Sequence, residues 1–414
     1  MKLGTPQLHI LYVTFDGVLQ PLGFSQCVRV VIALARRGFR YDLLSIETKR
    51  DVDDRRRVES VKQLLADVGV AWTIIGVDLS GSARRSSEAF ARVGAAAFAI
   101  VNRRHTSLIH ARGYQAGAIA NAIRRLKGVP YLFDARGCWI DERPEWFAGS
   151  TAYAAGKFVE RKLYEDALAV VTLTELHAND VVDGAFGTRN RNAVMAIPTC
   201  ADYDDFSIAP NRPSKPHASA VVPADVRQRL QDRITLGIVG ALNRSYLSKQ
   251  TLTLVKRACE MNPRIHLLVL TQQQSEYAAL LTSSGMQSKD FTLASVVHED
   301  MPAWLSWIDF GLLLLVDKIA KRGSMPTKLA EFFAAGVRPV AHGCNSEMTS
   351  WVRRAKSGVV LDATEEKDLV DAAQAIASCH SKADDLQRAR HITAPHFSLV
   401  AGVDRYASLL ERLY

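Results

Sequence analysis

The sequence contains no long apolar run. Its 414 residues include no stretch of about 18 uncharged apolar residues, so it predicts no membrane-spanning helix. The N-terminal stretch MKLGTPQLHILYVTF carries one lysine and then the pattern of a buried strand. It lacks the apolar core and the small-residue cleavage site of a signal peptide. We therefore expect a cytoplasmic protein.

Cysteine is scarce, and its positions argue against two kinds of site. The six cysteines are widely scattered, and none belongs to a CxxC pair. This pattern indicates neither a zinc site nor a disulfide framework. We expect free thiols in a reducing compartment, most of them buried.

Acidic residues are fewer than basic ones, which gives the chain a formal net charge of +9. Such a chain attracts anions, among them nucleotide phosphates, an acidic membrane leaflet and nucleic acids. Arginine pairs or triplets occur at residues 55–57, 84–85, 103–104 and 124–125. Each alone is typical of a solvated helix face, but together they favour an anionic membrane surface as a partner, at the inner face of the membrane. The sequence has no RNA-recognition or zinc-finger signature, so we expect no nucleic-acid partner.

Short apolar runs alternate with amphipathic stretches over the first half of the chain. Residues 25–37 have the periodicity of a helix, with Ser25 as its N-cap and Gly38 as its C-terminal stop. Strands are expected at residues 9–15, 41–46, 70–77, 107–110, 130–134, 169–174 and 193–197. Strands that alternate with helices predict a parallel sheet covered on both faces.

A proline-rich stretch separates this half from a second one. Residues 208–223 contain four prolines among Ser, Asn and Lys, which is typical of an exposed linker. Further strands are expected at residues 234–239, 265–270, 291–297, 310–315, 338–341 and 358–361.

These patterns predict an α/β protein of two doubly wound, Rossmann-like domains that face a central cleft, where ligands lie beyond the carboxyl ends of the strands. We expect an N-terminal domain over residues 1–205, a linker over 206–232 and a C-terminal domain over 233–395. A helix over residues 396–414 would pack back on the N-terminal domain.

The most informative segment is KIAKRGSMPTKLAEFFAAGVRPVA, at residues 318–341. Pro326 suits the first turn of a helix, and Gly336 would end that helix. A loop that enters a helix presents free backbone N–H groups and the positive end of a dipole, which together favour a phosphate or diphosphate.

Charged side chains surround this expected helix start. Lys321, Arg322 and Lys328 add positive charge to it. Glu331 would lie near Lys328 and away from the apolar face, where its carboxylate can accept two hydrogen bonds from a ribose diol. The alternative is an exposed glutamate paired with Lys328, which would stabilise the helix by roughly 0.2–0.5 kcal/mol.

The stretch PTKLAEFFAAGVRPVA resembles the donor-site helix of retaining glycosyltransferases with the GT-B fold, the family-4 type. The resemblance implies that Glu331 binds the ribose of a nucleotide. It also implies that a diphosphate is held by Ser324, Met325, Pro326, Thr327 and Lys328. Many members carry another glutamate where this chain has Gly323, so recognition of the donor sugar must differ here or use backbone groups.

Further segments resemble a bacterial polysaccharide-biosynthesis branch of the same family. The clearest is YLFDARGCWIDER at residues 131–143. Others are DG at residues 16–17, LGFSQ at 22–26, IPTCAD at 197–202 and GIVGALNRSYLSK at 237–249. The resemblance thus covers almost the whole chain.

The resemblance also implies roles for residues outside the main segment. Arg244 and Lys249 would neutralise the leaving diphosphate, since fixed cations stabilise the charge that develops there. Arg136 either lies at the cleft, near the donor phosphate or the acceptor, or belongs to a structural network of ion pairs around its loop.

Three further places are candidates for donor binding. Gly17 and Gly23 follow the first strand in the segment that resembles the family opening. Val297 and His298 lie where related enzymes contact the nucleobase through backbone groups.

No metal or other cofactor is expected. Two DxD strings, at residues 51–53 and 202–204, have the pattern that holds a metal in another glycosyltransferase fold, but here their contexts do not favour that role. We expect a metal-independent hexosyltransferase that uses a nucleotide-diphosphate sugar as substrate and a glycan or lipid-linked acceptor. The alternatives are a nucleotide-sugar epimerase of GT-B fold and a non-catalytic GT-B partner subunit.

Overall fold

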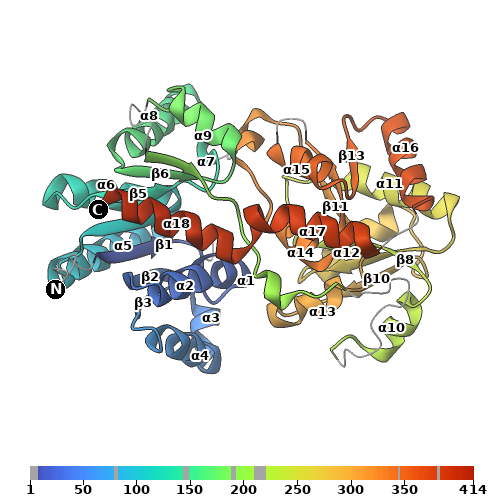
Figure 1. The fold of residues 1–414 in the computed structure, drawn as a ribbon, viewed down its shortest axis with the longest axis horizontal. Coiled ribbons are helices and arrows are strands. Elements are labelled where there is room, and N and C mark those ends of the chain that lie inside the picture. The colour runs from blue at the N-terminus through green and yellow to red at the C-terminus, as the bar shows by residue number, and fades with distance from the viewer. Residues whose placement is uncertain are drawn as a thin grey trace. The chain divides into compact units, whose positions relative to one another are not determined.

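The computed structural model describes residues 8–78, 83–142, 149–187, 193–208, 221–343, 346–379 and 383–414. The chain divides into two compact units. Unit 1 comprises Met1–Pro198 and Gly402–Tyr414, and unit 2 comprises Thr199–Ala401. Figure 1 shows the helices and strands of both units in chain order.

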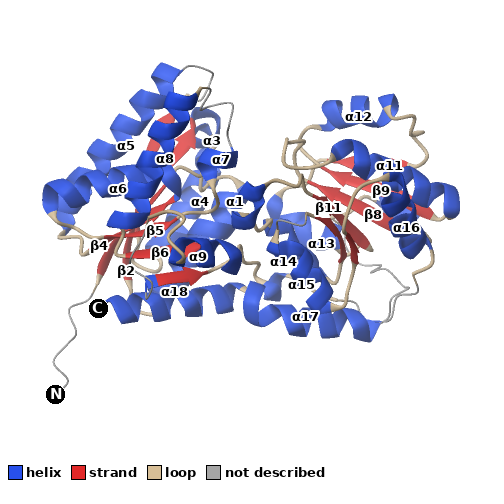
Figure 2. Ribbon diagram, turned by 90° about the horizontal axis from the view of Figure 1, so that it is seen from above, coloured by secondary structure: helices blue, strands red, loops and turns tan. Residues whose placement is uncertain are grey.

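Unit 1 is built on a parallel sheet. Its described strands lie in the order β3-β2-β1-β4-β5-β6-β7, and each neighbouring pair runs parallel. The strands are β1 (His9–Thr14), β2 (Arg40–Thr48), β3 (Ala71–Val77), β4 (Leu108–Arg112), β5 (Tyr131–Asp134), β6 (Ala169–Thr172) and β7 (Val194–Ala196). Helices lie on both sides of the sheet, as Figure 2 shows, which explains why β1, β4 and β5 are buried along their whole length.

The helices of unit 1 connect consecutive strands. They are α1 (Pro21–Gly23), the π-helical turn η1 (Phe24–Val28), α2 (Arg29–Arg36), α3 (Lys49–Asp53), α4 (Arg55–Ala66), α5 (Ala83–Arg104), α6 (Gly113–Lys127), α7 (Trp139–Glu142), α8 (Ser150–Asp166) and α9 (Glu175–Val182). The last helix of the chain, α18 (Leu399–Leu413), returns to unit 1 at Gly402.

The first helical segment differs from the sequence prediction at its start. We expected it to begin at Ser25, but helical structure begins at Pro21 and passes through the π-helical turn before α2. Proline at the first helical position favours this earlier start. Ser25 lies within the helical turn, and its hydroxyl donates to the carbonyl of Leu22 at 3.2 Å instead of capping the helix. The expected stop is correct, since Gly38 has a φ of 98°.

Unit 2 repeats the architecture. Its described strands lie in the order β10-β9-β8-β11-β12-β13, again all parallel. They are β8 (Ile234–Val239), β9 (Ile265–Leu270), β10 (Phe291–Ala294), β11 (Phe310–Leu314), β12 (Arg338–His342) and β13 (Val359–Leu361). The sequence predicted a strand at each of these places, although β10 ends three residues before the expected Val297.

The helices of unit 2 cover both faces of this sheet (Figure 2). They are α10 (Ala224–Leu230), α11 (Ser248–Met261), α12 (Gln274–Ser283), α13 (Met301–Leu305), α14 (Thr327–Ala335), α15 (Glu347–Ala355), α16 (Glu366–Ala377) and α17 (Ala383–Phe397). Short 3-10 turns occur at η4 (Tyr203–Asp205), η5 (His298–Asp300) and η6 (Ile319–Gly323).

A glycine in β11 brings α14 close to the sheet. A Cβ at Gly311 would lie 2.1 Å from the ring of Phe332, which is fully buried. Only glycine leaves room for this ring, so the sequence of β11 fixes the distance of α14 from the sheet.

The boundary region differs from the prediction. Residues 209–220 of the expected linker lie outside the described residues, but the part that follows forms helix α10, which buries Leu230 in unit 2. The contact boundary lies at Pro198 and not at residue 205. Backbone hydrogen bonds of Ala201 explain this shift. Its amide donates to the carbonyl of Phe397 at 2.9 Å, and its carbonyl accepts the amide of Leu399 at 2.8 Å.

The C-terminal residues contact unit 1 at several points. The hydroxyl of Tyr406 donates to Asp134 at 2.9 Å, and that of Tyr414 donates to the carbonyl of Ser107 at 2.8 Å. These hydrogen bonds hold the end of α18 against β4 and β5.

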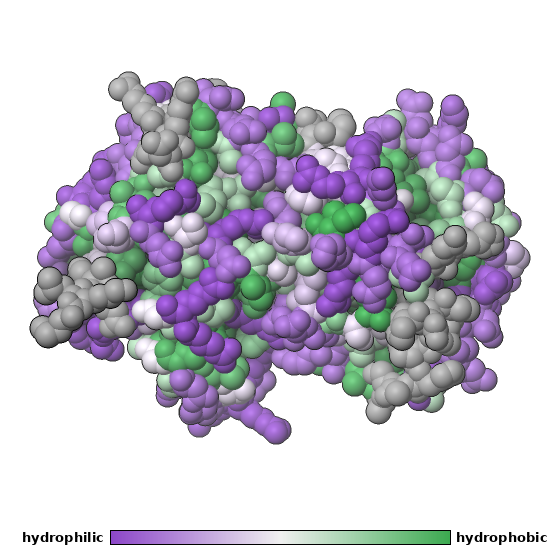
Figure 3. Space-filling model, in the orientation of Figure 1, coloured by the Kyte–Doolittle hydropathy of each residue, from purple (hydrophilic) through white to green (hydrophobic). Residues whose placement is uncertain are grey.

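None of the helices in the described part of the chain has the length and apolar character needed to span a bilayer. Figure 3 shows a mostly hydrophilic face on which apolar residues form small separate groups. The five described cysteines are free thiols, three of them buried, as expected from the sequence. The sixth, Cys344, lies outside the described residues.

Candidate functional site

Each sheet has one point where the direction of its connections reverses. In unit 1 it lies between β1 and β4, and in unit 2 between β8 and β11. Loops leave such a point in opposite directions, and the crevice between them is the usual ligand position in doubly wound folds. Residues at the carboxyl ends of these strands are therefore the candidates for ligand binding in each unit.

In unit 2 the loops after β8 and β11 are joined by backbone hydrogen bonds. The amide of Val316 donates to the carbonyl of Ser245 at 2.9 Å, and the amide of Leu247 donates to that of Leu314 at 2.9 Å. A side-chain bond adds to these, since the ammonium of Lys321 lies 3.1 Å from the Ser245 hydroxyl. Lys321 is only 7% exposed, so its charge is held in a fixed position.

The N-terminus of α14 lies at the end of the loop after β11. Pro326 occupies the N-cap position, and no side chain caps the helix. The first N–H groups of a helix have no partner within it, so those of Thr327 and Lys328 remain for another acceptor. The preceding carbonyl, of Met325, accepts a hydrogen bond from Thr199 at 3.1 Å, which fixes the approach of the chain. The start of α14 thus presents the backbone N–H groups that the expected diphosphate-binding site would use.

Lys328 reaches from α14 to the loop after β8. Gly240 has a φ of 105°, and a Cβ there would lie 3.0 Å from the Lys328 ammonium nitrogen. The same nitrogen lies 5.5 Å from the centre of the Tyr246 ring, which is a cation–π contact. The ammonium groups of Lys321 and Lys328 therefore both lie beside the loop after β8.

Glu331 is half-buried on α14, one turn after the helix start, and not fully exposed as the alternative of a surface pair with Lys328 requires. Burial raises the pKa of its carboxyl to about 7, while nearby Lys328 acts in the opposite direction. A carboxyl with this pKa is partly protonated at neutral pH and responds strongly to a neighbouring hydrogen-bond donor.

The remaining candidates of unit 2 lie at the same edge of the sheet. Ser324 is half-buried between η6 and Pro326. Arg244 and Lys249 are exposed, the first in the loop after β8 and the second in the first turn of α11. The loop that carries Arg244 is contacted by Lys321, which comes from the segment after β11.

Val297 and His298 follow β10 at the same edge. Val297 exposes 57% of its surface, and its carbonyl accepts the amide of Asp300 at 3.1 Å. His298 is half-buried and begins η5. An exposed backbone turn at this place fits a contact made by main-chain groups.

In unit 1 the loop after β1 is held by a buried carboxylate. Glu47 accepts the amides of Val18 at 2.8 Å and Leu19 at 3.2 Å. Burial raises the pKa of this carboxyl, although the three groups that donate to it, including the Ser45 hydroxyl, lower it in part.

Gly17 and Gly23 lie against each other in this loop. A Cβ at Gly23 would come 2.1 Å from the carbonyl oxygen of Gly17, and one at Gly17 would come 3.1 Å from the Glu47 carboxylate. Both glycines therefore have a packing role, which is independent of the donor contact that the resemblance implies.

Asp134 lies at the centre of a buried network at the end of β5. Its carboxylate accepts hydrogen bonds from Arg136 at 3.3 Å, from Arg112 at 3.5 Å and from the Tyr406 hydroxyl. Burial alone would raise the pKa of this carboxyl, but Arg136, the buried His110 ring and Arg112 hold the pKa well below its usual range. Asp134 is thus a fixed negative charge.

Arg136 adopts a φ of 58°, which is rare for a residue with a side chain. Its guanidinium is bound to Asp134 and its side chain is 13% exposed, so the ion-pair network that the sequence left open is present. Arg143, from the same motif, lies outside the described residues.

Sequence reasoning missed Arg112. It ends β4 at the switch point of unit 1, is buried, and donates to Asp16 at 2.8 Å. The predicted strand stopped at His110, two residues too early, so Arg112 was not placed at the sheet edge. A polar residue at the end of a buried strand was the available signal.

Among the described residues no group of three or more His, Cys, Asp or Glu is arranged to hold a metal ion. In the DxD strings, Asp51 accepts the Thr48 hydroxyl at 2.6 Å, and Asp202 accepts the amide of Asp204 at 3.3 Å. Both aspartates therefore have local roles at the start of short helices.

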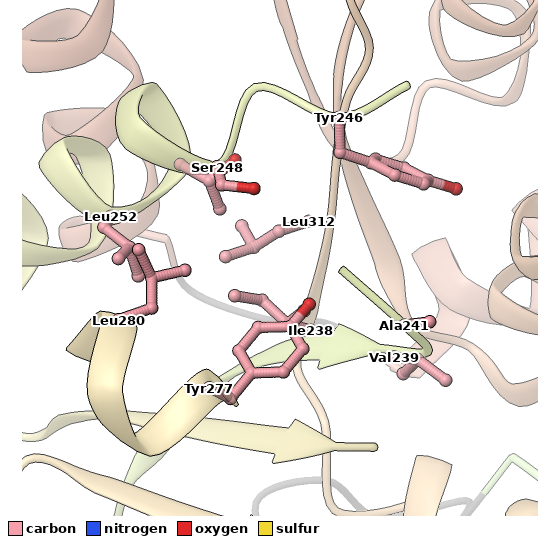
Figure 4. A pocket seen from close by; sticks show the side chains of 10 residues that line it. Ile238, Val239, Ala241, Tyr246, Ser248, Leu252, Tyr277, Leu280 and Leu312 are labelled. Atoms are coloured by element: carbon pink, nitrogen blue, oxygen red, sulfur yellow. The ribbon is translucent and has the colours of Figure 1, made fainter. Parts of the chain in front are cut away.

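A narrow apolar pocket lies beside the end of β8. Its free volume of about 30 Å³ has room for about one water molecule, so it cannot hold a nucleotide. Figure 4 shows Leu252, Leu280, Leu312 and Tyr277 around the same space.

Comparisons with known proteins agree with this geometry. Residues 26–198 match the family model of the glycosyl transferase 4-like domain. No curated protein matches the chain in sequence.

Solved structures match over nearly the whole chain. HepE from Anabaena, in complex with UDP and glucose, has a TM-score of 0.68 at 15% identity and covers 98% of this chain and 100% of its own. Sucrose-phosphate synthase from Thermosynechococcus elongatus has a TM-score of 0.70 at 15% identity, with coverages of 98% and 99%. The trehalose 6-phosphate synthase of Burkholderia multivorans has a TM-score of 0.67 at 13% identity and covers 99% of both chains.

These likenesses show the fold of the chain. The chain therefore has the GT-B fold, and the match of residues 26–198 to the glycosyl transferase 4-like model agrees with its resemblance to the family-4-type glycosyltransferases.

Proposed function

We propose that the chain is a hexosyltransferase, which binds a nucleotide-diphosphate sugar in unit 2 and a glycan or lipid-linked acceptor in unit 1. Its place would be in polysaccharide or glycoconjugate assembly at an anionic membrane surface. The observation that carries the proposal is the uncapped start of α14 at the switch point of unit 2, with Lys321 and Lys328 beside it. A structural neighbour bound to UDP makes uridine nucleotides the first donors to test.

The proposed reaction exchanges one bond at the anomeric carbon for another. The bond to the diphosphate oxygen breaks, a bond to the acceptor hydroxyl oxygen forms, and the hydroxyl proton is released. The diphosphate leaves with additional negative charge. The N–H groups of Thr327 and Lys328 and the ammonium groups of Lys321 and Lys328 would stabilise it without a metal. Glu331 would accept the ribose hydroxyls, and retention at the anomeric carbon follows the family resemblance.

Two alternatives make different predictions. A GT-B epimerase would convert the nucleotide sugar with no acceptor present. A non-catalytic subunit would bind the nucleotide without transfer or hydrolysis, and Gly323 in place of the family glutamate is the feature that favours it.

A thermal-shift panel of nucleotide sugars tests the donor site first. A ligand at 100 times its dissociation constant should stabilise the protein by about 2.7 kcal/mol. Product analysis with and without acceptor glycans then separates transfer, epimerisation and simple binding.

Calorimetric titration of Glu331→Ala locates the site. Loss of hydrogen bonds to a charged group costs about 1.5–3 kcal/mol, so donor affinity should fall roughly ten- to a hundredfold. Glu276→Ala, which removes an exposed glutamate from α12 of the same unit, is the matched control and should bind normally. Equal affinities of the two variants would contradict the placement of the donor.

A further inference from the structure

Basic residues gather at the amino-terminal edge of the sheet of unit 1, opposite the functional groups. Strands β2, β1, β4 and β5 are neighbours and run parallel, so their first residues lie at one edge. The chain reaches that edge at the start of β2 and at the ends of α5 and α6. Arg36 and Arg37 are exposed at that edge, and Arg37 pairs with Asp404. Six further exposed cations there, which we call the edge cluster, are Arg40, Arg103, Arg104, Arg124, Arg125 and Lys127.

Contacts connect the parts of the edge cluster. Arg104 of α5 lies 3.7 Å from Asp42 of β2. The Lys127 ammonium lies 4.8 Å from the centre of the Phe98 ring, which joins the end of α6 to α5. The edge cluster is therefore one continuous surface, although its members come from separate parts of the sequence.

Carboxylates neutralise only part of this charge. Asp166 lies 3.1 Å from Arg125 and 3.8 Å from Arg124, and Asp42 is shared between Arg104 and His9. In the described part of the chain, these two aspartates pair with three of the six cations of the edge cluster, so an excess of positive charge remains.

Stabilisation of the helix ends explains only some of these residues. Cations near the last turn of α5 and α6 interact favourably with the helix dipole. That account leaves out Arg40, which begins a strand, and Leu126, which exposes 72% of its surface between Arg125 and Lys127. An exposed leucine beside arginines is better suited to contact with a lipid surface, which has an anionic headgroup layer and an apolar interior, than to exposure to water.

We propose that the edge cluster and Leu126 dock unit 1 on an anionic lipid bilayer. The cations would contact the headgroups, and Leu126 would enter the boundary between headgroups and acyl chains. Arg112 and Asp134 lie at the opposite edge of the same sheet, so this contact would not cover that edge. The proposal rests on the membrane surface as a partner in the proposed function, but not on the transfer reaction.

Another group of arginines lies away from the edge cluster. Residues 55–57 begin α4, which follows β2 and α3, so they lie toward the carboxyl edge. They provide a matched control of equal charge: Arg55→Gln/Arg56→Gln/Arg57→Gln is compared with Arg103→Gln/Arg125→Gln/Lys127→Gln.

Cosedimentation with vesicles tests the proposal in the absence of nucleotide. The wild-type protein should bind phosphatidylglycerol-containing vesicles at low salt, lose binding as salt rises, and ignore pure phosphatidylcholine. The variant of the edge cluster should bind at least about thirtyfold more weakly, and the α4 variant within about threefold of wild type. Leu126→Ser should weaken binding severalfold.

Three outcomes would overturn the proposal: equal losses in both triple variants, no binding of wild type to anionic vesicles, or no effect of Leu126→Ser. Retention on a polyanion such as heparin without vesicle binding would assign the surface to a different partner. Circular dichroism and melting temperature confirm that each variant is folded. Nucleotide titration is measured separately, so a failure of the transferase proposal does not affect this result.

Discussion

Glu331→Gln should make the protein less sensitive to pH. The folded protein holds the Glu331 proton up to a pKa of about 7, against an ordinary value of 4.5. Between these two pH values the folded state binds more protons than the unfolded state, so stability falls as pH rises. Glutamine has a similar shape and no charge, so the variant should lack this loss.

The magnitude follows from the size of the shift. Each pKa unit corresponds to about 1.36 kcal/mol, so the wild type should lose at most about 2 kcal/mol relative to Glu331→Gln between pH 5.5 and 7. Because solvent reaches this half-buried carboxyl, the loss of stability should be smaller than this upper limit. Above about pH 8, where the carboxyl is ionised in the folded protein as well, the difference should stay constant.

Urea unfolding of both proteins at several pH values between 5.5 and 8 measures the difference directly. Glu276→Gln, on an exposed helix surface, should follow the wild type at every pH. A difference between wild type and Glu331→Gln that does not change with pH would refute the reasoning, because it would mean that the carboxyl titrates normally in the folded protein.

Three further predictions concern packing, charge and metal. Gly23→Ala should destabilise the protein by more than about 1 kcal/mol, since its Cβ would meet the Gly17 carbonyl at 2.1 Å, whereas Gly94→Ala, with its nearest neighbour at 3.9 Å, should be neutral or stabilising in the same melting experiment. Asp134→Asn should cost about 3–5 kcal/mol in urea unfolding, because it removes the buried carboxylate that Arg112 and Arg136 share; a change below about 1 kcal/mol would contradict the network. Sugar transfer should survive EDTA, and activity that is lost on chelation and restored by magnesium or manganese would disprove the metal-independent reaction.

Much of the fold follows from local patterns in the sequence. Buried parallel strands such as β9 are continuous apolar runs with turn residues at both ends, and these were located to within a few residues. The start of the helical segment at Pro21 was missed because the π-helical turn interrupts the ordinary helical period. The helix α10 was missed because it is short and follows a run of prolines, so its burial of Leu230 depends on tertiary contacts.

The site was predicted only where one segment carries it. The helix start near Lys328 and Glu331 is contiguous, so its motif was visible. The contact of Lys321 with Ser245 joins residues 76 positions apart, and no local pattern reports it. The same holds for Arg112, whose partner Asp16 lies in the loop after β1 and whose partner Asp134 ends β5.

The two units hold their cations differently, and this difference bears on substrate binding. In unit 1, Arg112 and Arg136 are bound to the carboxylates of Asp16 and Asp134, so little positive charge remains there for another anion. In unit 2, the ammonium of Lys321 contacts the Ser245 hydroxyl and that of Lys328 contacts the ring of Tyr246, close to the uncapped start of α14.

This contrast favours diphosphate binding in unit 2 and an uncharged hydroxyl acceptor in unit 1. A variant with Lys328→Met should therefore lose affinity for a nucleoside diphosphate more than for an acceptor glycan. Lys367→Met, on the exposed surface of α16, is the control and should change neither affinity. If Lys328→Met weakened only the acceptor, the assignment of the two units would have to be exchanged.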